Sequence, residues 1–80
     1  MERFTIVIQK QNYELIVGDC YSIHFFDVDI SFHGLTVKIE DTYWKNEDGE
    51  NMFYIWVPDH KEDYLVSDRE IRYIKKVNGR

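Results

Sequence analysis

Residues 35–57 read LTVKIEDTYWKNEDGENMFYIWV, two stretches of alternating apolar and polar side chains joined by Asn46-Glu47-Asp48-Gly49. A two-residue alternation is typical of a strand with one face in the core. The linking residues suit a type I turn in which Gly49 takes a left-handed conformation, where a Cβ is costly. We therefore predict a central hairpin that pairs Asn46 with Glu50, Trp44 with Met52, Thr42 with Tyr54, and Glu40 with Trp56.

Burial enforces this register, because a slip of one residue would place Lys38 and Glu40 in the core. The register leaves one defect, since it puts Asp41 opposite Ile55 on the inner side. We expect Asp41 to lie at an open end of the sheet. The side chains predicted to point inward are Leu35, Val37, Ile39, Phe53 and Ile55.

The same register places four large side chains on the outward face: Trp44, Met52, Tyr54 and Trp56. Clustered apolar groups on an outward face indicate a contact surface. They are equally consistent with a second layer, in which another strand such as the N-terminal one lies over them.

The composition predicts a mostly β protein with a single domain over residues 1–80. Val, Ile, Thr, Tyr, Phe and Trp supply 32 of the 80 residues, and Ala is absent. The formal net charge of −5 argues against a general phosphate binder. The single cysteine, Cys20, cannot form an internal disulfide, and no signal peptide or long apolar run is visible. We expect a cytoplasmic protein that does not associate with a membrane.

The N-terminal half contains two further strand patterns. Residues 3–10 are apolar on both sides, which predicts a strand covered on each face and followed by a turn at Gln11-Asn12. Residues 20–25 alternate cleanly, and the change of parity at Phe25-Phe26 predicts a bulge or a sharp bend. Residues 26–33 fit either a strand or a long ordered loop, and their alternation favours the strand.

The C-terminal half begins with a charged loop over residues 58–63 and a short strand over residues 64–66. Ser67 followed three residues later by Glu70 is a capping box, which predicts a helical turn. Residues 71–77 then fit either a helix, with Ile71, Ile74 and Val77 on one face, or a strand from Arg72. The many β-branched and aromatic residues favour the strand.

The order of these signals resembles the small SH3-like β-barrels. Leu15-Ile16-Val17-Gly18-Asp19 precedes one strand, Gly34 precedes the next, and the tight hairpin and the Ser67 turn follow. The resemblance, over residues 15–77, implies a barrel of five to six antiparallel strands, here with an extra N-terminal strand and a helical turn near 67–71. Barrels of this kind mostly bind peptides, proteins or nucleic acids, and fold alone does not fix function.

No residue pattern indicates catalysis, a metal or a cofactor. Cys20 and His24 would lie about 13 Å apart on a strand, and no motif frames either as a nucleophile with its base. The glycines form no phosphate-binding pattern. The remaining possible metal ligands lack the usual zinc spacings: Asp27, Asp29, His33 and His60. We expect a protein that is not an enzyme.

Protein binding fits the sequence best, because interfaces favour aromatic residues and Met at the centre with charge around the edge. An acidic field would steer a partner with a basic surface. An acidic inhibitor of the kind that viruses or mobile elements encode, occupying the basic surface of a nucleic-acid-binding protein, matches this description. The predicted binding residues are Glu40, Thr42, Trp44, Glu47, Asp48, Glu50, Met52, Tyr54 and Trp56.

The alternative is a nucleic-acid-binding barrel. Residues 67–80 carry two acids against five bases, and exposed aromatics such as Tyr54 and Trp56 can stack on single-stranded bases. The basic residues are Arg69, Arg72, Lys75, Lys76 and Arg80.

Overall fold

The computed structural model describes residues 1–77, in which seven strands and one short 3₁₀-helix follow one another along the chain. Strands make up most of the fold, which confirms the mostly β prediction and the extra N-terminal strand. The strands are β1 (Arg3–Ile8), β2 (Gln11–Ile16), β3 (Cys20–Phe25), β4 (Thr36–Lys45), β5 (Asn51–Val57), β6 (Glu62–Ser67) and β7 (Ile71–Lys76), and the 3₁₀-helix η1 covers Asp68–Glu70.

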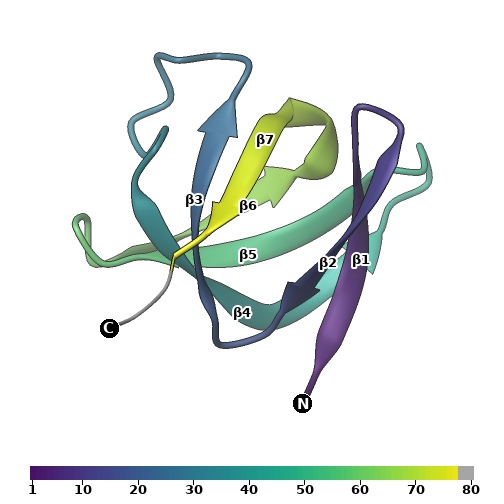
Figure 1. Cartoon of the computed structure of the whole chain (residues 1–80), viewed down its shortest axis with the longest axis horizontal. Helices are drawn as coiled ribbons and strands as arrows, with labels where there is room; N and C mark the ends of the chain where they lie inside the picture. Colours follow the sequence, from purple (N-terminus) through teal and green to yellow (C-terminus); the bar gives the residue numbers. More distant parts are fainter. Residues whose placement is uncertain (78–80) are drawn as a thin grey trace.

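Two antiparallel sheets enclose one core. Five strands form a curved sheet in the order β6-β5-β4-β3-β7, and β1 and β2 form a separate hairpin. Figure 1 shows this hairpin lying across the open side of the curved sheet, so that the whole is a small barrel-like shell. The shell is filled by apolar side chains from both sheets, among them Ile6, Leu15, Ile23, Phe25, Val37, Ile39, Phe53, Ile55, Val66 and Ile71.

The turn between β4 and β5 has the predicted geometry. Gly49 has a φ of +80°, and its N–H donates to the Asn46 carbonyl at 3.0 Å. The Asn46 side chain accepts from the backbone of Asp48 and of Glu50, which fixes the loop from within. Trp44 pairs with Met52, as the alternation predicts.

The far half of the same hairpin corrects the predicted register. A bulge between Ile39 and Tyr43 shifts the pairing, so that Ile39 lies opposite Ile55 and Lys38 opposite Trp56. The predicted pairs of Thr42 with Tyr54 and of Glu40 with Trp56 are therefore wrong. The physical reason is the defect noted above: the bulge keeps Ile39 in the core and leaves Asp41 exposed.

The N-terminal hairpin corrects two further predictions. Its turn lies at Gln9-Lys10, both with positive φ, and Gln11 already belongs to β2. Two consecutive left-handed residues give the type I′ geometry that suits a two-residue hairpin. The strand is also not covered on both faces, because Thr5 and Val7 on its outer face are exposed.

Residues 26–35 form a loop with turns, so the predicted strand is wrong there. The sheet ladder between β3 and β7 shifts at His24/Phe25, one residue before the position at which the change of parity predicts a bulge or bend. Beyond it, Phe26 and Val28 are 58% and 61% exposed. Phe32 instead anchors the loop, with its ring 5.3 Å from Phe25. Only the second half of the loop therefore packs on the core, although the alternation runs through both halves.

The C-terminal segment follows the favoured prediction. Both hydrogen bonds of the Ser67–Glu70 capping box are present, and the chain continues as strand β7. The Asp68 carboxylate is buried and accepts from the Val7 N–H and from the Asn51 side-chain amide, each at 2.8 Å. It thereby joins the N-terminal hairpin to the curved sheet. Within residues 1–77, no helix is long and apolar enough to cross a membrane.

Candidate protein-docking face

Large apolar side chains cover the outward side of β4, β5 and β6, which we call the outer aromatic face. Trp44 on β4 and Leu65 on β6 are each 42% exposed, and the rings of Trp44 and Tyr54 lie 6.2 Å apart. The ladder places Leu65 directly beside Tyr54. The outer aromatic face comprises Trp44, Met52, Tyr54, Trp56 and Leu65.

The N-terminal strand does not cover these side chains. β1 lies on the inner side of the curved sheet, where Phe4 stacks on Tyr43 at 4.1 Å and packs on Phe53 at 5.5 Å. Ile6 from the same strand is fully buried in the core. Of the two alternatives that the sequence left open, the second layer formed by this strand is therefore wrong.

Two carboxyl groups meet at one end of the outer aromatic face. Glu40 on β4 and Asp63 on β6 flank Trp56, which pairs with Asp63 in the ladder. A hydrogen bond between the two carboxyls, followed by desolvation and by the charges of Asp63 and Asp41, raises the pKa of Glu40 to about 7. Lys38 offsets only part of this effect. Acidic groups therefore crowd this end of the face.

The β4 bulge opens a cleft beside this pair. Its volume is about 410 Å³, and its walls combine an indole, two carboxylates and one lysine. Val17 and Gly18 from the β2–β3 connection and Ile39 from β4 complete them. The lining residues are Val17, Gly18, Lys38, Ile39, Glu40, Asp41 and Trp56.

At the other end of the outer aromatic face, the tip of the β4–β5 hairpin carries three of the acidic residues that were predicted to bind a partner, and their surroundings differ. The Glu50 carboxylate accepts hydrogen bonds from the Asn46 amide at 2.8 Å and from the Ser67 hydroxyl at 3.1 Å. These bonds lower the pKa of Glu50. Glu50 is thus engaged within the fold, whereas Glu47 and Asp48 are exposed, as is Thr42 on β4.

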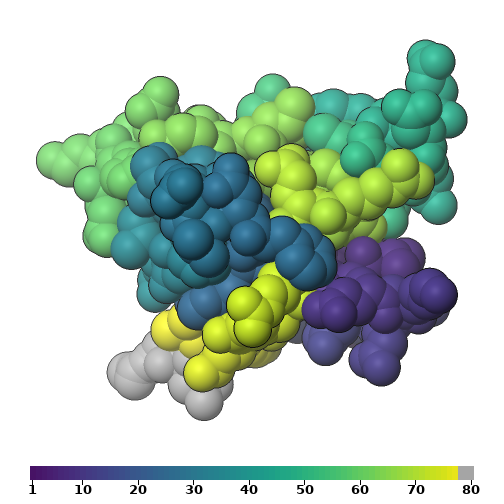
Figure 2. Space-filling view, turned by 90° about the horizontal axis from the view of Figure 1, so that it is seen from above, coloured from purple at the N-terminus to yellow at the C-terminus, as the bar shows by residue number. Residues whose placement is uncertain are grey.

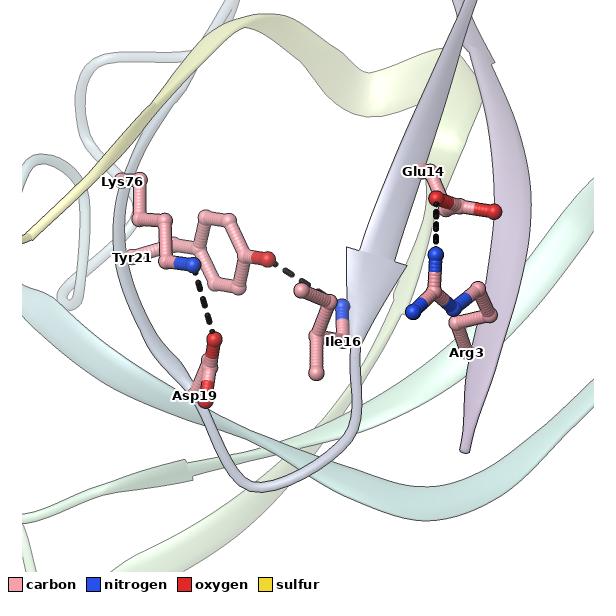
Figure 3. A network of polar contacts seen from close by, with 6 residues as sticks. All are labelled: Arg3, Glu14, Ile16, Asp19, Tyr21 and Lys76. Carbon is pink, nitrogen blue, oxygen red and sulfur yellow. Dashed lines mark hydrogen bonds and ion pairs between the residues drawn. The ribbon is translucent and has the colours of Figure 1, made fainter. Parts of the chain in front are cut away.

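The basic residues lie away from the outer aromatic face or are paired. Arg69 donates to the Asp48 carbonyl at 2.7 Å, and Lys76 forms an ion pair with Asp19 at 2.9 Å that raises the pKa of Lys76 (Figure 3). Arg72 and Lys75 are exposed on β7, which β3 and β4 separate from β5. Arg80 lies outside the described residues.

The histidines and Cys20 do not gather into a metal or nucleophile site. The Ser22 hydroxyl lies 3.1 Å from His24 Nε2 and donates to the Gly34 carbonyl at 3.0 Å, and His33 Nδ1 accepts from the Phe25 N–H at 2.9 Å. These contacts hold the 26–35 loop to β3. In the part of the chain that the structure describes, no three His, Cys, Asp or Glu side chains are placed to hold a metal ion.

Alternation alone predicted which way the aromatic residues of β4 and β5 face, and the structure confirms it. Leu65 was missed because the strand that carries it was expected to span only three residues. The pairing of Glu40 with Asp63 was missed because it joins strands that are not neighbours.

No protein-family model, no curated protein and no solved structure matches this chain. The resemblance to SH3-like barrels therefore stays a prediction.

Proposed function

We propose that this chain is a protein-binding module of the SH3-like kind, and that the outer aromatic face is its docking surface. The partner presents a basic surface, such as that of a nucleic-acid-binding protein. By occupying that surface, the chain would act as an acidic inhibitor of its partner.

The uncovered rings carry this proposal. Trp44, Tyr54 and Leu65 form a contiguous apolar group on the outer side of the curved sheet, and none of them belongs to the core cluster of residues 1–77. Burial of Trp and Tyr at the centre of an interface contributes more to affinity than burial of most other residues. A face of this kind gains free energy when a second molecule excludes water from it.

Charge supports a basic partner. Glu40, Asp41 and Asp63 lie at one end of the face, and Glu47 and Asp48 lie at the hairpin tip. The hydrogen bond with Asp63 and desolvation are the main causes of the raised pKa of Glu40, and the charges of Asp63 and Asp41 add to them. A cationic group arriving there removes this repulsion, and the acidic field speeds its approach.

Binding of nucleic acid through the same face is less well supported. The exposed bases of β7 and the aromatic rings of β5 do not share one surface, and acidic groups flank the rings. A phosphate backbone would meet repulsion on both ends of the aromatic face.

The test is affinity capture with the purified chain from cells that produce it, followed by identification and measurement of the retained protein. Trp44→Ala should weaken the captured complex at least about 30-fold, a hot-spot effect of about 2 kcal/mol. Tyr13→Ala is the matched control, because Tyr13 is also a partly exposed ring but lies on β2. Equal binding by the wild type and the Trp44 variant would refute the proposed surface.

A further inference from the structure

We propose that the partner contributes an extended basic segment that adds to the open edge of β6 as an antiparallel strand. This inference rests on the proposed function, because the added strand would continue the outer aromatic face beyond Leu65. It names the recognition mode and the chemistry of the segment that is bound.

The edge of β6 is unpaired. β6 is the last strand of the five-stranded order and pairs only with β5. An edge strand presents N–H and C=O groups that another strand can use. Only the residues of β6 that do not bond to β5 direct these groups outward.

The alternation of hydrogen-bonded residues along the ladder identifies the residues of β6 that face the open edge. The Asn46 N–H donates to the Glu50 carbonyl, so Glu50 directs its backbone groups toward β4. Alternate residues of a strand point to opposite neighbours, and Phe53 and Ile55 therefore face β6. Their partners there, Val66 and Tyr64, are the hydrogen-bonded residues of β6. Asp63 and Leu65 must then direct their N–H and C=O groups to the open edge.

Two side-chain contacts agree with this parity. The Ser67 N–H, which has the same parity as Leu65, is not used by β5 and donates to the Glu70 carboxylate at 3.1 Å. The Asn51 N–H, which has the same parity as Phe53, points past the end of β6 and donates to Asp68 at 3.2 Å. Glu70 thereby closes one end of the edge, and the turn over residues 58–61 closes the other.

The unpaired part of the β6 edge is therefore short and consists of the N–H and C=O groups of two residues, Asp63 and Leu65. Over residues 1–77, no hydrogen bond of these two backbone units is found outside the ladder. Leu65 and Asp63 are both exposed. The backbone groups of both residues are therefore free to form hydrogen bonds with a partner strand.

The side chains beside this unpaired part of the edge set the sequence of the bound segment. In an antiparallel pair, residues opposite each other project on the same face. The residue opposite Leu65 therefore lies beside Tyr54, and the residue opposite Asp63 lies beside the Glu40–Asp63 pair. From N- to C-terminus, the segment has an apolar residue, any residue, and then lysine or arginine.

Charge selects a basic segment of another protein over a second copy of this chain. Each copy has a formal net charge of −5, and Asp59, Glu62 and Asp63 lie at or beside the edge. Pairing two such edges would bring like charges together, whereas a lysine or arginine opposite Asp63 meets two carboxyls. The same acidic groups oppose edge-to-edge aggregation in the free chain.

Leu65→Pro tests the edge directly. Its N–H points away from β5, so proline removes an outward donor and no ladder hydrogen bond. Tyr64 is already extended, as a residue before proline should be. Leu65→Ala is the matched control, because it loses the same side chain and keeps the N–H.

The probe is a displayed library of short random peptides, selected on the wild-type chain at low salt. Selected peptides should share the apolar–any–basic pattern. Leu65→Pro should bind them roughly tenfold more weakly than Leu65→Ala does, the loss expected for one hydrogen bond and a blocked edge. In the wild type, the amide hydrogens of Asp63 and Leu65 should exchange quickly alone and slowly with bound peptide.

These experiments distinguish a failure of the edge inference from a failure of the proposed docking face. If peptides bind in a Trp44-dependent way but Leu65→Pro equals Leu65→Ala and the two amides stay unprotected, the edge inference is refuted while the docking face stands. If Trp44→Ala has no effect on any captured ligand, the proposed function fails first. A dimer that Leu65→Pro dissociates would overturn the basic segment in favour of a second copy. If Leu65→Pro does not fold, amide exchange in the wild type decides.

Discussion

The two ends of the curved sheet both carry aromatic rings on the outward side, but only one end uses them within the fold. On β3 and β7, His24 stacks on Tyr73 at 4.3 Å with an interplanar angle of 11°, and His33 meets His24 edge-on at 5.2 Å. On β4 and β5, Trp44 and Tyr54 contact each other at 6.2 Å and no loop reaches them.

The difference comes from the 26–35 loop. It covers the β3 end and supplies His33 and Gly34, whereas the other connections of the sheet are tight turns. Figure 2 shows the residues of this loop in blue, forming a raised cap beside β7 and beside the green residues around β6, where the Phe32 ring lies 4.4 Å from the Tyr64 ring. A ring is thus structural where a long connection returns over it, and available for binding where the connections are short.

The largest expected difference between the two ends is in stability. His33→Ala removes the acceptor of the Phe25 N–H in a partly buried place, and an unsatisfied buried donor costs about 1–3 kcal/mol. Denaturant unfolding should show a loss near 2 kcal/mol. A loss below about 0.5 kcal/mol would mean that the loop does not depend on this contact.

Acidification should weaken the β3–β7 end. Desolvation, followed by the charges of His33, Lys75 and Arg72, lowers the pKa of His24 below its usual 6.5. The unfolded chain then binds the proton more readily, so stability is present above pH 6.5 and is lost as pH falls through the lower folded pKa.

His24→Phe keeps a ring beside Tyr73 and cannot take up a proton. The unfolding free energy of this variant should fall less steeply than that of the wild type below pH 6.5, in denaturant titrations at several pH values. Identical slopes would show that His24 does not contribute to the pH dependence of stability.

The β4–β6 end should respond to pH with the opposite sign. Because the folded pKa of Glu40 is about 7 against an ordinary 4.5, the folded state binds more protons between these values. The stabilisation of the folded state by protonation of Glu40 is complete below about pH 4.5 and is lost as pH rises through 7. The effect should stay below about 1 kcal/mol, because exposed pairs are screened by water.

Glu40→Gln preserves a hydrogen-bonding group opposite Asp63 and removes the titration. This variant should not lose the stability that the wild type loses between pH 5 and pH 8. Since His24 acts in part of the same range, the informative quantity is the difference between variant and wild type at each pH. A difference that does not change with pH would exclude the shared proton.

The smallest expected effect is the loss of stability in Trp44→Ala. The ring is partly exposed and contacts only Tyr54 among the rings, so the unfolding free energy should change by about 0.5 kcal/mol or less. Thermal and denaturant unfolding would check this. A loss comparable to that of His33→Ala would mean that the two ends do not differ, and that Trp44 is part of the fold.

Signals held within a few residues were readable from the sequence. Asn46-Glu47-Asp48-Gly49 and the Ser67–Glu70 capping box each fix their own local hydrogen bonds, and both are present. The turn at Gln9-Lys10 was missed because neither residue is the glycine or asparagine that usually accepts a positive φ. The neighbouring Asn12 was the stronger local signal and was misleading.

Features that depend on distant pairings were not readable. The β4 bulge buries Ile39 and exposes Asp41 at the same time. The need for a bulge becomes visible only when β5 is paired with β4, because no residue within β4 indicates it. The Glu40–Asp63 pair then depends on that bulge and on β6. In the 26–35 loop, apolar residues alternate with polar ones as they do in a strand. Phe32 is buried, but Phe26 and Val28 belong to the same alternation and are exposed to solvent.

The attachment of the N-terminal hairpin has a consequence for how the chain folds. Two of its polar contacts involve partners far along the chain: the Asp68 carboxylate accepts from the Val7 N–H, and the Arg72 carbonyl accepts from the Gln9 side chain. The sequence separations of these two contacts are 61 and 63 residues. Contacts between residues so far apart form slowly, so we expect the docking of Val7 and Gln9 onto the η1–β7 segment to be a late step in folding.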